Sequence, residues 1–247
     1  MKKNTPPYLV LQLEADLNEN DDVQFLNTVT DEGKALFRSL FVALPFTRME
    51  AMAGHFPDSG ILFGATQLND CSQGSFTAPI AAGMVKNAGG QFVLVGTRKE
   101  KASLKGTIQD KLSRAFEKGL KVIFCLDGQE DLAQQCALLD PHSPFFDDPH
   151  PLVVYQPQLT ALKEYLPSKE ELAALHSTVK EAISAAWKDK ADKVSLIVQL
   201  PSDLSGFSSL LEGTPFDGLF CIKSGIYPHS VHEELVTLAK VHGADVA

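Results

Sequence analysis

The chain has few of the features that mark the specialised classes of protein. Its cysteines are scattered and form no CxxC pair, at Cys71, Cys125, Cys136 and Cys221. This spacing indicates neither a disulfide framework nor a zinc site, so we expect reduced and mostly buried thiols. No apolar run approaches the roughly 18 residues of a membrane-spanning helix. The sequence also lacks a GxGxxG motif, a Walker loop, a nucleophile elbow and a catalytic triad spacing, and no cofactor is predicted.

Positive charge is also scarce, since the formal net charge is −9 and the pI is about 5.2. Nucleic acids and anionic membrane surfaces need a basic face, so we expect neither as the main partner. The chain begins MKKNTPPYLVLQLEAD, but Gln12 and Glu14 interrupt its apolar stretch. We therefore predict no signal peptide and expect a cytoplasmic protein.

What the chain does have is material for one large core. Its 247 residues are 44% hydrophobic and 21% charged, and this length suits two ordinary domains or one α/β barrel. Eight short runs are apolar and rich in β-branched residues: Tyr8–Leu13, Leu40–Leu44, Gly60–Ala65, Gln91–Gly96, Lys121–Leu126, Leu152–Gln156, Val194–Leu200 and Gly218–Ile222. The runs are continuous rather than alternating, which is typical of strands covered on both faces.

Helical patterns lie between these runs. The clearest is SKEELAALHSTVKEAISAAWKD, in which Ser168 and Glu171 form a capping box. TIQDKLSRAFEKG ends at the C-terminal cap Gly119, and HSVHEELVTLAKVHG predicts a further helix beginning near Ser230. A strand and a helix repeated about eight times in roughly 250 residues predict a (β/α)₈ barrel, here one domain spanning 1–247. An open doubly wound sheet is the alternative.

Several stretches resemble one family, in the order in which that family shows them. GSFTAPIA stands where triosephosphate isomerases have GAFTGEIS, ALPFT resembles PPFT, and GLKVIFC resembles the fifth strand. VVYQPQL resembles AYEPVWA, and FDGLFCIKSG resembles IDGFLVGGAS. The resemblance covers nearly the whole chain except about 130–150, and it also implies a (β/α)₈ barrel.

The departures from the family pattern fall at its catalytic positions. In this family, itself the standard example of a tuned acid–base pair, a glutamate abstracts a proton and a neutral histidine polarises the carbonyl. By the resemblance, the glutamate is replaced by Gln156. The family's GHSERR becomes GTRKEK, so Thr97 replaces the histidine and Lys99 the motif's glutamate.

The first-strand motif NWKMN falls on LEADL, which puts Leu13 and Ala15 in place of its asparagine and lysine. A slip of one residue would place Glu14 and Asp16 there instead. Neither register supplies a cation.

The phosphate-binding turns implied by the resemblance are altered as well. The family's GGS turn becomes LPS, in which Pro201 has no N–H to donate and only Ser202 matches. Its later GG pair becomes Ile222 and Lys223, and Ile222 carries a Cβ. Ser202 and Lys223 are the candidates for binding a small anionic ligand. The family's closing lid aligns with ALKEYL, where Glu164 would bring a negative charge.

An amide has no basic site at neutral pH, so we predict a triosephosphate-isomerase-like barrel that lacks isomerase activity and has a binding, regulatory or unknown role. One alternative is an enzyme of different chemistry on another small phosphorylated metabolite, using Thr97, Arg98, Lys223 and either Glu14 or Asp16. The other is a divergent working isomerase that interconverts glyceraldehyde 3-phosphate and dihydroxyacetone phosphate.

Two loops raise further expectations. By the resemblance, the loop Gly74–Ala78 would reach a neighbouring subunit, which implies a homodimer. DPHSPFFDDPH, from Asp140 to His150, brings two histidines close to several aspartates. Its ligand spacing is irregular, so we predict a proline-rich surface loop rather than a metal site.

Overall fold

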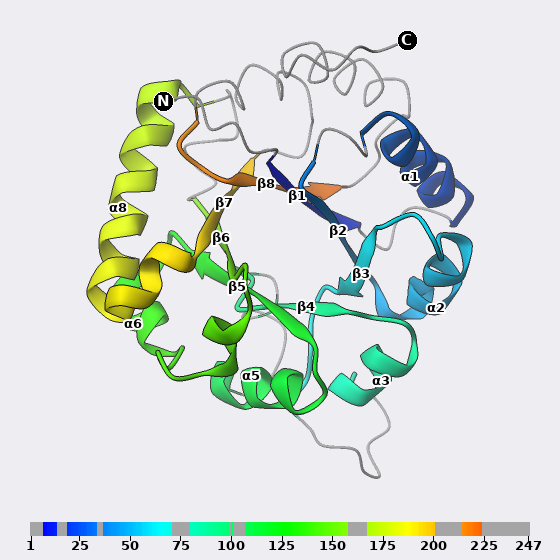
Figure 1. The fold of residues 1–247 in the computed structure, drawn as a ribbon, viewed down its shortest axis with the longest axis horizontal. Coiled ribbons are helices and arrows are strands. Elements are labelled where there is room, and N and C mark those ends of the chain that lie inside the picture. The colour runs from blue at the N-terminus through cyan, green and yellow to red at the C-terminus, as the bar shows by residue number, and fades with distance from the viewer. Residues whose placement is uncertain are drawn as a thin grey trace.

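Eight parallel strands close into a barrel in the order of the chain, β1 to β8 (Figure 1). The computed structural model describes residues 7–13, 19–33, 37–70, 80–98, 100, 107–157, 167–200 and 214–223. The strands are β1 (Tyr8–Leu13), β2 (Ser39–Leu44), β3 (Leu62–Ala65), β4 (Phe92–Val95), β5 (Lys121–Asp127), β6 (Leu152–Gln156), β7 (Ser195–Leu200) and β8 (Gly218–Lys223). The predicted (β/α)₈ barrel is confirmed, and each predicted apolar run contains one strand or overlaps it closely.

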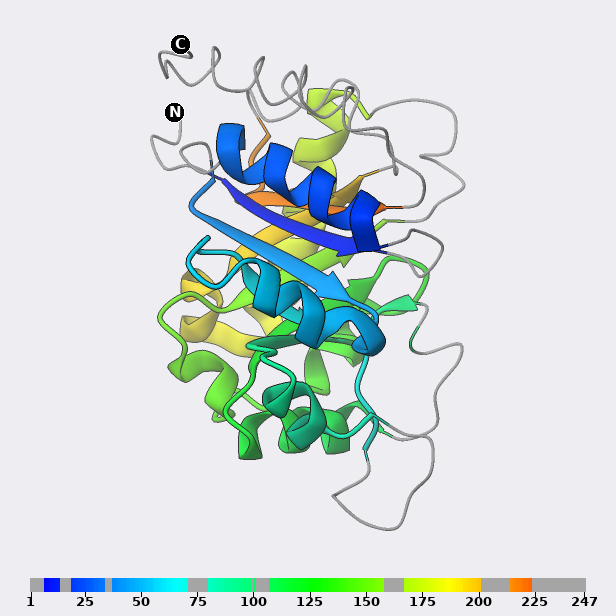
Figure 2. The ribbon, with the colours of Figure 1, turned by 90° about the vertical axis from the view of Figure 1, so that its right-hand side faces the viewer.

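Helices surround the strands, and Figure 2 shows α1 and α2 outside β1 and β2. The described helices are α1 (Glu19–Gly33), α2 (Phe46–His55), α3 (Ala82–Asn87), α5 (Ile108–Glu117), α6 (Leu132–Ala137) and α8 (Lys169–Trp187), with short 3₁₀ helices η1 (Pro144–Asp147) and η2 (Lys188–Lys193). Within the described part of the chain, no helix combines the length and the apolar character that crossing a membrane requires.

Alternation along each strand divides the core into two layers. The inner layer fills the barrel and contains Tyr8, Val10, Phe41, Ala43, Phe92, Leu94, Ile123, Cys125, Leu152, Val154, Ile197 and Phe220. The outer layer joins the sheet to the helices; on β1 it takes Leu9, Leu11 and Leu13, which alternate with the inner residues. Both layers are apolar, so the strands have no polar face, as their continuous apolar runs predict.

The helix ends follow the predicted capping chemistry. Ser168 and Glu171 form both hydrogen bonds of the capping box that starts α8. Gly119 follows α5 with φ of +64°, a left-handed conformation that favours glycine. The helix predicted from Ser230 lies outside the described residues.

The segment from Asp140 to His150 packs onto the barrel. Phe145 and Phe146 of η1 are buried, contrary to an entirely surface-exposed loop. At its end, Asp148 accepts a hydrogen bond from Lys121 Nζ at 2.6 Å, and the ring of His150 contacts Arg38 Nη2. No group of three metal-ligating side chains occurs here or elsewhere among the residues described.

Candidate functional site

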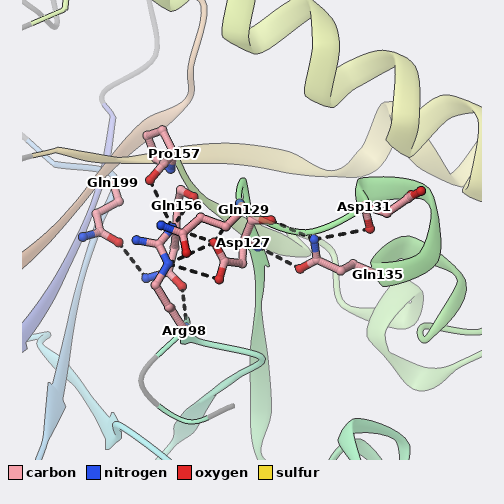
Figure 3. Close-up of polar contacts among 8 residues, drawn as sticks. All are labelled: Arg98, Asp127, Gln129, Asp131, Gln135, Gln156, Pro157 and Gln199. Atoms are coloured by element: carbon pink, nitrogen blue, oxygen red, sulfur yellow. Dashed lines mark hydrogen bonds and ion pairs between the residues drawn. The ribbon is translucent and has the colours of Figure 1, made fainter. Parts of the chain in front are cut away.

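Four polar side chains gather at the C-terminal end of the barrel, where enzymes of this fold place their active sites (Figure 3). Arg98 follows β4, while Asp127, Gln156 and Gln199 lie at or near the ends of β5, β6 and β7. We refer to these four residues as the mouth network. Its three strand residues are at least nine-tenths buried.

The mouth network contains one charged pair, Arg98 and Asp127. Through Arg98, this pair links β5 to the end of β6. Arg98 Nε lies 3.0 and 3.1 Å from the two carboxylate oxygens of Asp127, and Arg98 Nη2 lies 2.6 Å from Oδ1. Arg98 Nη2 also donates to the carbonyl oxygens of Gln156 and Pro157, each at 3.1 Å. The guanidinium therefore neutralises the carboxylate and fixes the backbone where β6 ends.

The amides of the mouth network form a chain of hydrogen bonds. The backbone N–H of Arg98 donates to Gln156 Oε1 at 3.0 Å. Gln156 Nε2 then donates to Gln199 Oε1 at 2.6 Å. Both polar atoms of the Gln156 side chain are thus engaged within the protein.

A side chain of α6 fixes the backbone of Asp127 by hydrogen bonds. Gln135 accepts from the backbone N–H of Asp127 and donates to its carbonyl, both at 2.8 Å. The backbone N–H of Gln129 adds a 3.0 Å bond to Asp127 Oδ1. Nearby, burial and the Asp127 charge raise the pKa of Tyr155, and Arg98 lowers it in part.

Thr97, which the sequence resemblance aligns with the family histidine, is buried and caps a turn. Its hydroxyl oxygen accepts from the backbone N–H of Glu100 at 3.1 Å. The Glu100 carboxylate accepts from the backbone N–H of Gly96 at 2.7 Å and from Lys111 Nζ at 3.0 Å. Glu100 and Lys111 are both almost fully buried, so their charges compensate each other within the core.

On β1, the two neighbouring side chains at the end of the strand point to opposite sides. Leu13 belongs to the outer layer of the core. Gln12 follows Tyr8 and Val10 on the inner face, and its side chain is 7% exposed. The residue that β1 contributes to the inside of the barrel is therefore Gln12, which the sequence motifs did not single out.

The other candidates contribute less to the described geometry. Ile222 lies on the inner side of β8, partly buried. Lys223 is the last residue of β8. Ala15, Ser202 and the Gly74–Ala78 loop lie outside the described residues, as do Glu14, Asp16, Lys99, Pro201 and Glu164.

Sequence reasoning also missed Asp127 and Gln199. Each is a polar residue at the end of an otherwise apolar run, in KVIFCLD and VSLIVQL. Counting in steps of two from the inner residues Cys125 and Ile197 would have placed both on the inner face.

Comparison with known proteins decides the family. The family model described as "Triosephosphate isomerase" matches residues 15–198. The chain belongs to the triosephosphate isomerase family. A triosephosphate isomerase of Protochlamydia amoebophila is 36% identical over 90 residues, which cover 35% of this chain and 34% of that protein. One from Bartonella bacilliformis is 24% identical over 190 residues, covering 72% of this chain and 74% of the relative.

The fold is shared with a solved member of the triosephosphate isomerase family. The crystal structure of triosephosphate isomerase from Bartonella henselae matches with a TM-score of 0.75 and 17% sequence identity, covering 96% of this chain and 99% of the other. The barrel is thus similar over nearly its whole length, while five in six of the compared residues differ.

Proposed function

We propose that this member of the triosephosphate isomerase family does not catalyse the isomerase reaction, and that the mouth of its barrel has a binding role. The observation that carries the proposal is the state of Gln156. Its Oε1 accepts from the backbone N–H of Arg98 and its Nε2 donates to Gln199, so the side chain is held as a structural link.

The reaction needs a base that removes a proton from carbon. A carboxamide has no basic site at neutral pH, and acid–base groups typically contribute about 10² to 10⁴ in rate. Asp127 is the carboxylate of the mouth network, but both of its oxygens contact the guanidinium of Arg98. Its charge is therefore already compensated by a neighbouring cation.

The reaction also needs a group that polarises the substrate carbonyl. Thr97 is 4% exposed, and its oxygen already accepts the N–H of Glu100. No histidine lies at the C-terminal strand ends among the residues that the structure describes. Two separate parts of the isomerase reaction thus lack a supporting group among the described residues, which argues against a divergent working isomerase.

A coupled assay with glyceraldehyde 3-phosphate tests this proposal. At high protein concentration, we expect turnover at least about 10⁴-fold below that of an active isomerase measured alongside, because base and electrophile are both replaced. Turnover approaching that of the reference enzyme would contradict the proposal.

Two variants sharpen the assay. Gln156→Glu introduces a carboxylate but leaves the electrophile missing, so we expect less than about a tenfold gain. Gln24→Glu makes the same change at an exposed position on α1 and is the matched control. A large gain from Gln156→Glu alone would show that a single substitution, rather than several, silences the site.

A further inference from the structure

The amide chain of the mouth network ends in a donor without a protein partner. Gln199 accepts from Gln156 through Oε1, and its Nε2 makes no hydrogen bond with any residue that the structure describes. Figure 3 shows this nitrogen on the side of Gln199 that faces away from Gln156. Gln199 is only 8% exposed as a residue, but its Nε2 is not among the fully buried atoms without a partner, so this donor remains accessible from the mouth.

The direction of this chain follows from the backbone. The N–H of Arg98 can only donate, so Gln156 must present its oxygen to it. Gln156 then has only its NH₂ group to offer to Gln199. Gln199 must therefore accept this hydrogen bond through its own oxygen. The outward group of Gln199 is therefore an N–H donor, whichever way an isolated amide might be turned.

A second unpartnered amide lies on the inner face of β1. Gln12 is 7% exposed and makes no side-chain hydrogen bond within the described ranges. Gln12 and Gln199 both lie at this same end of the barrel, and their open amide groups are not among the fully buried, unpartnered polar atoms of the described residues. Two amides with free hydrogen-bonding groups in one place indicate a site that can bind a ligand.

Strand register places the two amides on either side of β8. Gln199 pairs with Phe220, and Gln12 pairs with Ile222, two residues further along β8. Two strand spacings and a two-residue offset put their Cα atoms about 11 Å apart. Ile222 lies between them, partly exposed and on the inner side of the strand.

The charged side chains described beside the mouth form two ion pairs. Arg98 is paired with Asp127, and Glu100 is paired with Lys111. What remains for a ligand is an N–H donor, a carboxamide that both donates and accepts, and an apolar side chain. Hydroxyl groups also donate and accept, and the C–H face of a polyol suits an apolar surface.

We propose that the mouth binds a small uncharged polyhydroxyl compound, with its hydroxyl groups on Gln199 and Gln12 and its C–H face on Ile222. This inference rests on the proposed binding role and names its ligand class. It differs from the anionic ligand suggested by Ser202 and Lys223, because the contacts proposed here use neither of these residues.

Saturation-transfer NMR on the full chain tests the inference with glycerol, erythritol and ribose, and with glycerol 3-phosphate as the charged counterpart of glycerol. We expect saturation transfer to at least one uncharged probe, and no tighter binding of glycerol 3-phosphate than of glycerol. Absence of transfer to all three uncharged probes would overturn the inference, as would binding of glycerol 3-phosphate at least about tenfold tighter than glycerol.

Two variants assign the signal to the site. Gln199→Leu and Gln12→Leu each remove one amide, and each should weaken binding about fivefold, the value of one hydrogen bond. Gln12→Leu leaves the mouth network intact, so it stays informative if Gln199→Leu fails to fold. Exposed Gln24→Leu should bind as the wild type does. Unchanged binding in Gln12→Leu would overturn the inference.

This test is separate from the isomerase assay. An inactive protein that binds no polyol overturns only the inference drawn from the amides. A protein with strong isomerase turnover overturns the proposed function, whatever it binds.

Discussion

At the scale of single residues, the side chains of the mouth network are held by hydrogen bonds to one another. Arg98 shows how this happens, because one side chain contacts a carboxylate on β5 and two carbonyl groups at the end of β6. Its own backbone N–H fixes the amide of Gln156. Arg98, which follows β4, therefore connects the ends of β4, β5 and β6.

The Asp127→Asn substitution tests how much this pairing stabilises the fold. It keeps the shape of the side chain but removes its charge, leaving the guanidinium with carbonyl partners alone. We expect the free energy of unfolding to fall by about 1–3 kcal/mol, less than for a fully buried pair because Arg98 is 21% exposed. Urea denaturation measures this, and Asp58→Asn in an exposed turn should change stability by less than about 0.5 kcal/mol. Equal effects at the two positions would contradict this account.

At the scale of elements, an aromatic cluster attaches η1 to the end of α8. The ring of Trp187 lies 5.4 Å from that of Phe146 and 6.3 Å from that of Phe145, measured between centroids. Trp187 Nε1 donates to the buried carbonyl of Cys136 at 3.0 Å, which adds α6 to the same junction. The segment around η1 thus contributes to the packing of three helical elements.

The Phe146→Ala substitution should remove most of this packing. A buried phenylalanine replaced by alanine typically costs about 3–5 kcal/mol, and Phe146 is 4% exposed. Trp187 is the sole tryptophan, so its fluorescence follows unfolding at this junction. Met84→Ala, on an exposed apolar residue of α3, should cost less than about 0.5 kcal/mol. A loss below about 1 kcal/mol for Phe146→Ala would show that the segment is not part of the core.

Elements were the most predictable level of this structure. Strands such as Leu152–Gln156 are continuous apolar runs with sharp ends, and the capping box at Ser168 is a local signal. The mouth network was harder to predict from the sequence, because the orientation of Gln199 depends on Gln156 and on a backbone group far away in the sequence. The resemblance drew attention to Gln156 and Thr97, and their assignment to altered catalytic positions stays a prediction. It could not show which groups bind these two side chains.

At the scale of the whole molecule, the buried thiol of Cys136 couples stability to alkaline pH. Burial raises the pKa of Cys136 from an ordinary value of 9.0 to about 11. The unfolded chain therefore loses this proton at lower pH than the folded chain does. The resulting stabilisation is complete below about pH 9 and is lost as the pH rises to about 11.

The Cys136→Ala substitution isolates this contribution. Between pH 9 and 11, we expect the wild type to lose about 2 kcal/mol more than the variant, since each pKa unit is worth about 1.4 kcal/mol. Denaturation with a reducing agent at pH 8, 9, 10 and 11 would show it, and the difference at pH 8 corrects for the missing side-chain volume. Parallel stability curves for the two proteins would contradict the assignment.

The hydrogen bond from the Arg98 backbone to Gln156 determines which substitutions at position 98 the amide chain tolerates. Because a peptide group sets the polarity of the amide chain, nineteen of the twenty amino acids at position 98 would preserve it, and only proline lacks the required N–H. Any substitution at residue 98 except proline would therefore keep the outward donor on β7, while the loss of the guanidinium would leave the buried Asp127 carboxylate without its cation. The polarity of the amide chain and the charge balance of the mouth thus depend on different parts of one residue.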